Sequence, residues 1–253
     1  MWWLLALACV KNSPTPESIE PPTAEPVSVE VESGVSADGN ITLDGRVRNA
    51  HWDDGDTFSY VDSDTGEKVK ARLSGFNTLE SYGPVHRWGE WTGDGLYVIA
   101  KEAGRVAQDG NWTCTQLSGS CGYGRICVSC PDLQATLLSE GLAHVFALKD
   151  PADPDMLAHQ HAAQAGARGM WAHGVPNELV TSLHSLDEKP GNTQTYNRLI
   201  STESGASTQL HHSDSYETCS WACPTDSCMR YIPYTQRYGE ARADCLRETS
   251  SEE

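Results

Sequence analysis

The chain has 253 residues, a formal net charge of −17 at pH 7 and a hydrophobic fraction of 38%. This length leaves room for one domain of about 130–150 residues with extensions, or for two small domains. The acidic balance and the lack of a basic patch argue against tight nonspecific binding to nucleic acid, which is driven by neutralising phosphates. They do not exclude hydrolysis of nucleic acid, since a bound cation can supply positive charge locally.

The first nine residues, Met1 to Cys9, form an apolar run that ends in small residues and a cysteine. The run is too short to span a bilayer. It resembles a bacterial lipoprotein signal, in which cleavage leaves a lipidated Cys9 as the new N-terminus. A plain secretory signal and a truncated start are the alternatives. We therefore expect an exported protein that is lipid-anchored at the cell envelope, or otherwise secreted.

The next segment, residues 10–39, is rich in Pro, Glu, Ser and Val. A segment of this composition cannot bury enough apolar surface to fold. It is predicted to be a disordered acidic linker, which its like charges keep extended.

Residues 40–174 are predicted to form one domain. Strand patterns occur in five segments and helical spacing of apolar residues in three. The strands are predicted at residues 41–49, 57–61, 69–76, 112–116 and 125–128, and the helices at residues 96–108, 133–140 and 154–168. This content favours an α+β fold in which a five-stranded OB-type β-barrel packs against about three helices.

The remaining third of the chain divides into two parts. Residues 175–216 are polar and rich in Ser, Thr and Asn, and are predicted to be a linker or a loosely ordered extension. Residues 217–253 form a cysteine-rich C-terminal module. Its Cys219 and Cys223 have the spacing of one helical turn, which favours two short helices clipped by disulfides.

The cysteines support export. Nine are present, and those after Cys9 fall into two groups of four, one at 114–130 and one at 219–245. An even, clustered set behind an export signal favours disulfides. The alternative is a zinc site, because Cys127 and Cys130 have CxxC spacing.

Charged residues of the middle region stand in short motifs. Asp56 lies in Asp54-Gly55-Asp56-Thr57, Glu80 follows Arg72 by eight residues, and Arg125 ends Tyr123-Gly124-Arg125. Further along are Glu140-Gly141-Leu142-Ala143 and an alanine-rich helix followed by Gly169-Met170-Trp171. In order and spacing, the chain from about Val47 to Trp171 resembles the staphylococcal nuclease family.

The resemblance implies a role for each residue, and the chemistry agrees. Phosphodiester hydrolysis needs an activated water and stabilised charge on the phosphoryl oxygens. Arg72 and Arg125 are expected to bind those oxygens with paired hydrogen bonds. Glu80 is the expected general base. The expected metal ligands for Ca²⁺, a cation that prefers oxygen, are Asp56, the Asn77 side chain and the Thr78 carbonyl.

Two departures from the family pattern stand beside Glu80. Asn77 replaces an Asp, which removes a negative charge from the metal site, and Leu79 replaces a Pro, which makes the loop less rigid. In the best-known member, tyrosines follow Gly-Leu-Ala and pack on the nucleotide; Ala147 and Lys149 occupy those places here.

The expected function is that of an exported Ca²⁺-dependent nuclease that hydrolyses DNA and RNA with low sequence specificity. The first alternative is a nuclease-fold binding module, anchored at the cell envelope, with weak catalysis or none. In a second alternative the C-terminal module carries the function and the barrel is its scaffold. No feature of the sequence identifies a protein partner.

Overall fold

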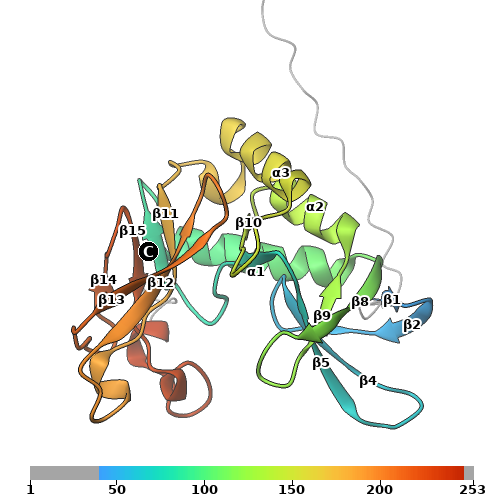
Figure 1. The fold of residues 1–253 in the computed structure, drawn as a ribbon, viewed down its shortest axis with the longest axis horizontal. Helices are drawn as coiled ribbons and strands as arrows, with labels where there is room; N and C mark the ends of the chain where they lie inside the picture. The colour runs from blue at the N-terminus through green and yellow to red at the C-terminus, as the bar shows by residue number, and fades with distance from the viewer. Residues whose placement is uncertain (1–39, 248–253) are drawn as a thin grey trace, which may run out of the picture. The chain divides into compact units, whose positions relative to one another are not determined.

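The computed structural model describes residues 40–247, which form an α+β fold (Figure 1). The predicted lipidation of Cys9 and the predicted linker at residues 10–39 lie outside the described residues. Within the described range, no helix is long and apolar enough to cross a membrane.

The largest sheet has seven strands in the order β2-β1-β8-β9-β5-β4-β3. They are β1 (Asn40–Leu43), β2 (Arg46–Asn49), β3 (His51–Trp52), β4 (Thr57–Val61), β5 (Lys68–Leu73), β8 (Trp112–Ser120) and β9 (Ile126–Ser129). Strands β2 and β3 lie at opposite ends of this order, yet only Ala50 separates them in the chain. The sheet therefore nearly closes on itself, like a barrel.

The sheet has seven strands where the sequence predicted five. The predicted strand at residues 41–49 is a hairpin, because Asp44 and Gly45 have φ values of 48° and 78°. Two successive positive φ angles in an Asp-Gly pair are typical of the tight turn that joins two antiparallel strands. Ala50 then separates β2 from β3, which pair with β1 and β4 respectively.

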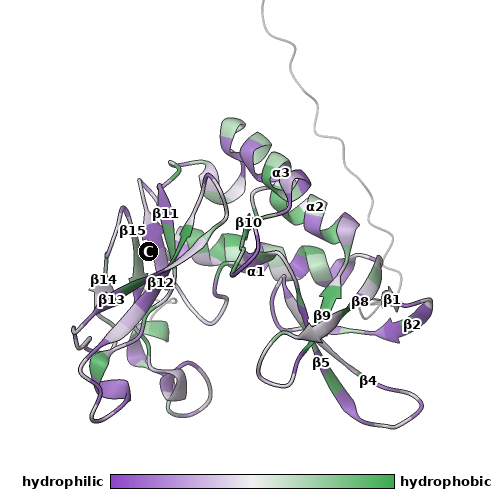
Figure 2. Ribbon diagram, viewed as in Figure 1, coloured by the Kyte–Doolittle hydropathy of each residue, from purple (hydrophilic) through white to green (hydrophobic). Residues whose placement is uncertain are grey.

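The three predicted helices are present: α1 (Gly93–Asp109), α2 (Pro131–Ser139) and α3 (Pro154–Ala165). Side-chain caps start two of them. The Thr92 hydroxyl accepts from the Gly95 N–H at 3.1 Å, and the Asp153 carboxylate accepts from the Asp155 N–H at 2.8 Å. In Figure 2, α1 and α2 carry both hydrophobic and hydrophilic stretches, as expected for helices with one face on a core.

The barrel and helices share one core. Its fully buried side chains come from strands and helices alike, and include Ile41, Phe58, Leu73, Val128, Leu133 and Leu137. A short two-stranded sheet of β6 (Phe76–Thr78) and β10 (Ala143–Val145) adjoins it and carries Asn77 and Thr78.

Residues 175–216 are not an irregular linker. They contain β11 (Glu178–Ser182), β12 (Thr195–Ser201) and β13 (Ser207–His212), which form an antiparallel sheet. Buried residues of β11 and β12 join this sheet to the rest of the molecule: Leu179 packs in a cluster with Trp88 and Trp171, and Val180 and Leu199 pack in a cluster with Tyr82 and Met229. The sequence pattern hid the strands because β13 is largely exposed and polar, so it lacks an apolar stripe.

Within residues 217–247, Cys219 and Cys223 do not share a helix as their spacing predicted, because β14 (Trp221–Ala222) lies between them. The C-terminal module also contains β15 (Ser227–Arg230) and the 3-10 turns η3 (Tyr234–Gln236) and η4 (Asp244–Leu246). Strand β15 pairs with β7 (His86–Trp88), a strand from the segment that follows Glu80. Long-range strand pairing, rather than helical periodicity, therefore organises these residues.

The predicted disulfides are confirmed as four pairs: Cys114–Cys130, Cys121–Cys127, Cys219–Cys245 and Cys223–Cys228. Each bond joins two cysteines of the same group. Several disulfides are typical of proteins that fold in an oxidising compartment, such as exported proteins.

Removal of Cys219–Cys245 is expected to cost more stability than removal of Cys223–Cys228. The two bonds have sequence separations of 26 and 5. Because a longer loop restricts the unfolded chain more, the paired Ser variants should lose about 3.5 and about 2 kcal/mol of unfolding free energy respectively. Urea denaturation followed by circular dichroism measures both losses, and a larger loss for the shorter loop would contradict this order.

Candidate active site

The loop that carries Asp56 lies between β3 and β4 and packs tightly. A side chain at Gly55 would place its Cβ 2.6 Å from the Thr78 methyl group and 3.0 Å from the Ala103 Cβ. Only glycine fits at such a distance. The loop is also held to β5, because the Leu73 N–H donates to the Asp56 carbonyl at 2.8 Å. Steric crowding therefore explains why the Asp54-to-Thr57 motif has glycine at position 55.

The buried Asp56 carboxylate is the centre of a hydrogen-bond network. Its Oδ1 accepts from Arg72 Nη1 at 2.7 Å and from the Thr57 hydroxyl at 2.8 Å. Its Oδ2 accepts from the Thr78 backbone N–H at 2.9 Å and from Arg72 Nη2 at 3.2 Å. Arg72 Nη2 also donates to Asn77 Oδ1. The fold thus brings four of the six predicted site residues into direct contact.

The oxygen atoms of this cluster fit the chemistry of a hard cation. Asp56 and Asn77 each direct a side-chain oxygen at the Arg72 guanidinium. A metal cation could therefore bind the same two oxygens in place of part of the Arg72 positive charge. The Thr78 hydroxyl is buried and has no hydrogen-bond partner in the described residues. No group of three His, Cys, Asp or Glu side chains able to hold a metal ion occurs within residues 40–247. The candidate ligands are instead one carboxylate with amide and threonine oxygens.

Two further carboxylates interact with Asp56. Burial raises the pKa of Asp54 well above its usual value, and the Asp56 and Glu80 charges raise it further. Burial also raises the pKa of Glu80, while the Arg237 and Arg72 charges oppose the rise. The Asp56 charge also helps to raise the pKa of Glu80, so the charges of these three carboxylates act on one another. Asp54 is not among the predicted site residues, although it stands in the same motif as Asp56.

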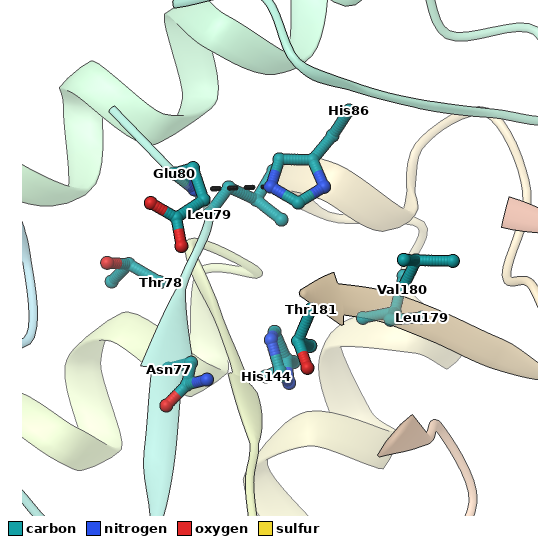
Figure 3. A pocket seen from close by; sticks show the side chains of 9 residues that line it. All are labelled: Asn77, Thr78, Leu79, Glu80, His86, His144, Leu179, Val180 and Thr181. Carbon is teal, nitrogen blue, oxygen red and sulfur yellow. Dashed lines mark hydrogen bonds between the residues drawn. The ribbon is translucent and has the colours of Figure 1, made fainter. Parts of the chain in front are cut away.

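Glu80 is the second residue after β6 and lines a pocket, which Figure 3 shows from close by. The lining residues are Asn77, Thr78, Leu79, Glu80, His86, His144, Leu179, Val180 and Thr181. The His86 ring faces the backbone of Glu80, whose N–H donates to His86 Nε2 at 3.3 Å (Figure 3). This bond fixes the point at which the chain turns away from the strand.

Both histidines of the pocket are neutral near pH 7. Burial and, to a smaller extent, the nearby His144 lower the pKa of His86 to about 3, and burial lowers the pKa of His144 to about 4. His144 lies opposite Asn77 in the β6–β10 pair. Neither residue stands in a recognisable motif, so only the fold places them beside the site.

Arg125 is presented by a tight loop that the Cys121–Cys127 disulfide closes. Three successive residues, Gly122, Tyr123 and Gly124, have positive φ values of 75°, 53° and 72°. Arg125 donates from Nη2 to the Cys121 carbonyl at 3.1 Å. The hydrogen bond to a carbonyl of its own loop therefore orients the Arg125 side chain, and the Cys121–Cys127 disulfide holds the loop closed.

The Arg125 side chain interacts with the site through charge rather than through a hydrogen bond. Burial lowers its pKa, the Arg72 charge lowers it further, and the Asp56 and Asp54 charges oppose this. Its guanidinium also lies 5.4 Å from the Tyr123 ring. Arg125 directly precedes β9, which pairs with β5 beside Arg72, so the Arg125 charge acts on the contact cluster of Asp56, Arg72, Asn77 and Thr78.

Comparison with protein-family models and with curated proteins finds no match for this chain.

Proposed function

We propose that this protein is a Ca²⁺-dependent nuclease of the staphylococcal nuclease type, which hydrolyses the phosphodiester bonds of DNA and RNA with low sequence specificity. The observation that carries the proposal is the contact cluster of Asp56, Arg72 and Asn77, with Glu80 beside it. In this proposal the barrel-like sheet is an OB-type barrel. The protein is exported and held at the cell envelope by a lipid on Cys9.

The chain's own residues would bind the phosphate and move the proton. Arg72 and Arg125 would donate hydrogen bonds to the phosphoryl oxygens from two sides. Glu80 would accept a proton from the attacking water, and its raised pKa makes it a stronger base than an ordinary carboxylate. A Ca²⁺ ion held by Asp56, Asn77 and Thr78 would supply positive charge that polarises the phosphate. Contacts to phosphate carry no sequence information, which accounts for the low specificity.

The second candidate is a nucleic-acid-binding module with weak catalysis or none. One observation favours it: Arg72 donates to both Asp56 and Asn77, so its guanidinium already has carboxylate and amide partners. Substrate and cation would have to take over these contacts before catalysis. A chain that cannot make this exchange would bind without hydrolysis.

Hydrolysis by the purified full chain is the direct test. Plasmid DNA, single-stranded DNA and RNA are incubated with Ca²⁺, with Mg²⁺ and with the chelator EGTA. We expect cleavage of all three substrates with Ca²⁺ and a loss of about 100-fold or more in rate with EGTA, which added Ca²⁺ restores. Equal rates in Ca²⁺ and EGTA would reject the metal site, and no cleavage under any condition would favour the binding module.

A further inference from the structure

Two exposed aromatic rings of the C-terminal module stand beside the candidate active site. Tyr234 is 78% exposed and Tyr238 is 62% exposed. The half-buried Arg237 lies between them in the chain. Exposed aromatic rings next to an arginine are the composition with which many proteins bind single-stranded nucleic acid, because every base offers a flat face for stacking.

Direct contacts place this segment against the loop that carries Glu80. The Arg237 guanidinium lies 4.8 Å from the Tyr82 ring and 6.0 Å from the Tyr234 ring. The Tyr238 ring meets the Tyr82 ring edge-on, with 6.0 Å between the centroids. Tyr82 follows Glu80 by two residues, so Arg237 and the Tyr238 ring pack on the segment that carries the candidate general base, and the Tyr234 ring lies next to Arg237.

The charges of the segment also interact with those of the site. Burial raises the pKa of Tyr238, and the Glu80 carboxylate raises it further. The residues from Arg230 to Arg247 include four arginines and two acidic residues, in a chain whose formal net charge is −17. This part of the module therefore offers phosphate a less repulsive surface than the rest of the chain.

Hydrogen bonds hold the segment in place. Arg237 Nε donates to the Ile232 carbonyl at 3.2 Å, and the Ala243 N–H donates to the Gln236 carbonyl at 2.9 Å. Arg242 Nη2 reaches across to the Tyr82 carbonyl at 2.7 Å. A surface that is ordered before binding loses less conformational freedom when a ligand arrives.

We propose that Tyr234, Arg237 and Tyr238 form a binding wall for single-stranded nucleic acid at the active site. The two tyrosine rings stack on bases next to the scissile phosphate, and Arg237 pairs with a neighbouring phosphate. The substrate class is therefore a single strand, or a duplex end whose bases have separated. This inference rests on the proposed nuclease function, since it assigns the substrate of the same site.

Binding without turnover tests the wall. A fluorescently labelled thymidine single strand of about eight nucleotides is titrated with the full chain in EGTA, and anisotropy gives the Kd. Tyr238→Ala and Tyr234→Ala should each weaken binding about 10-fold, because each removes one stacking ring. Tyr238→Phe keeps the ring and should bind like the wild type. Binding of a matched blunt duplex should be much less sensitive to these substitutions, since the bases of a duplex already stack on one another.

Tyr97→Ala on α1 is the control, and should leave the Kd unchanged. Thermal unfolding checks that each variant folds. The wall is rejected if Tyr238→Ala binds like the wild type, if Tyr238→Phe is as weak as Tyr238→Ala, or if the wild type does not bind the single strand. Hydrolysis in Ca²⁺ is measured in parallel. If binding depends on the tyrosine rings but no hydrolysis occurs, the nuclease function is rejected and the binding wall is retained. If hydrolysis occurs but binding does not depend on the rings, the binding wall is rejected and the nuclease function is retained.

Discussion

Glu80→Gln is expected to lower the nuclease rate by about 10²–10⁴-fold, the usual contribution of a positioned general base. The amide has almost the same size as the carboxylate but cannot accept the proton of the attacking water. The backbone bond from Glu80 to His86 does not involve the side chain, so the fold should persist. Initial rates on single-stranded DNA in saturating Ca²⁺ measure the loss.

The pH profile separates this role from a structural one. The wild-type rate should fall as Glu80 gains a proton, at a pH above the ordinary carboxylate range because burial raises its pKa. In Glu80→Gln this acid limb should disappear. Glu67→Gln, at an exposed position before β5, is the matched control and should keep both rate and profile. A Glu80→Gln variant with wild-type rates would remove Glu80 from the site.

Arg72→Ala is expected to lower the free energy of unfolding by about 3–5 kcal/mol in EGTA, because it leaves the buried Asp56 charge without its partner. The Asp56 side chain is 3% exposed and that of Arg72 is 22% exposed. If the same oxygens bind Ca²⁺, the cation should restore part of the lost stability. Urea denaturation with and without Ca²⁺ measures both effects without reference to activity.

Two comparisons sharpen this result. The exposed pair Arg46–Asp64 has side chains that are each 65% exposed, so Arg46→Ala should cost less than about 1 kcal/mol. The double variant Arg72→Ala with Asp56→Ala removes both charges, and should be more stable in EGTA than Arg72→Ala alone. Ca²⁺ should not stabilise the double variant. Equal stabilisation of the single and double variants would place the cation elsewhere.

Local signals in the sequence anticipated the helices and the disulfides. The helical spacing of apolar residues depends on residues within one or two turns of each other, so it can be recognised in a short window. The Asp44-Gly45 hairpin signal is equally local, but the predicted strand at residues 41–49 runs through it. The roles assigned to Arg72, Glu80 and Arg125 remain predictions, although the fold brings their motifs to one place.

The sequence by itself determined the α+β class, the clustered cysteines and the chemical groups available for phosphate and metal. Each depends on residue type or on short spacing. Only the tertiary structure decided that β15 pairs with β7, that the Thr78 N–H donates to Asp56, and that Arg237 and Tyr238 pack on Tyr82, two residues after Glu80. These contacts join residues far apart in the chain. Their formation depends on the burial and pairing of whole strands, which no short window of sequence contains.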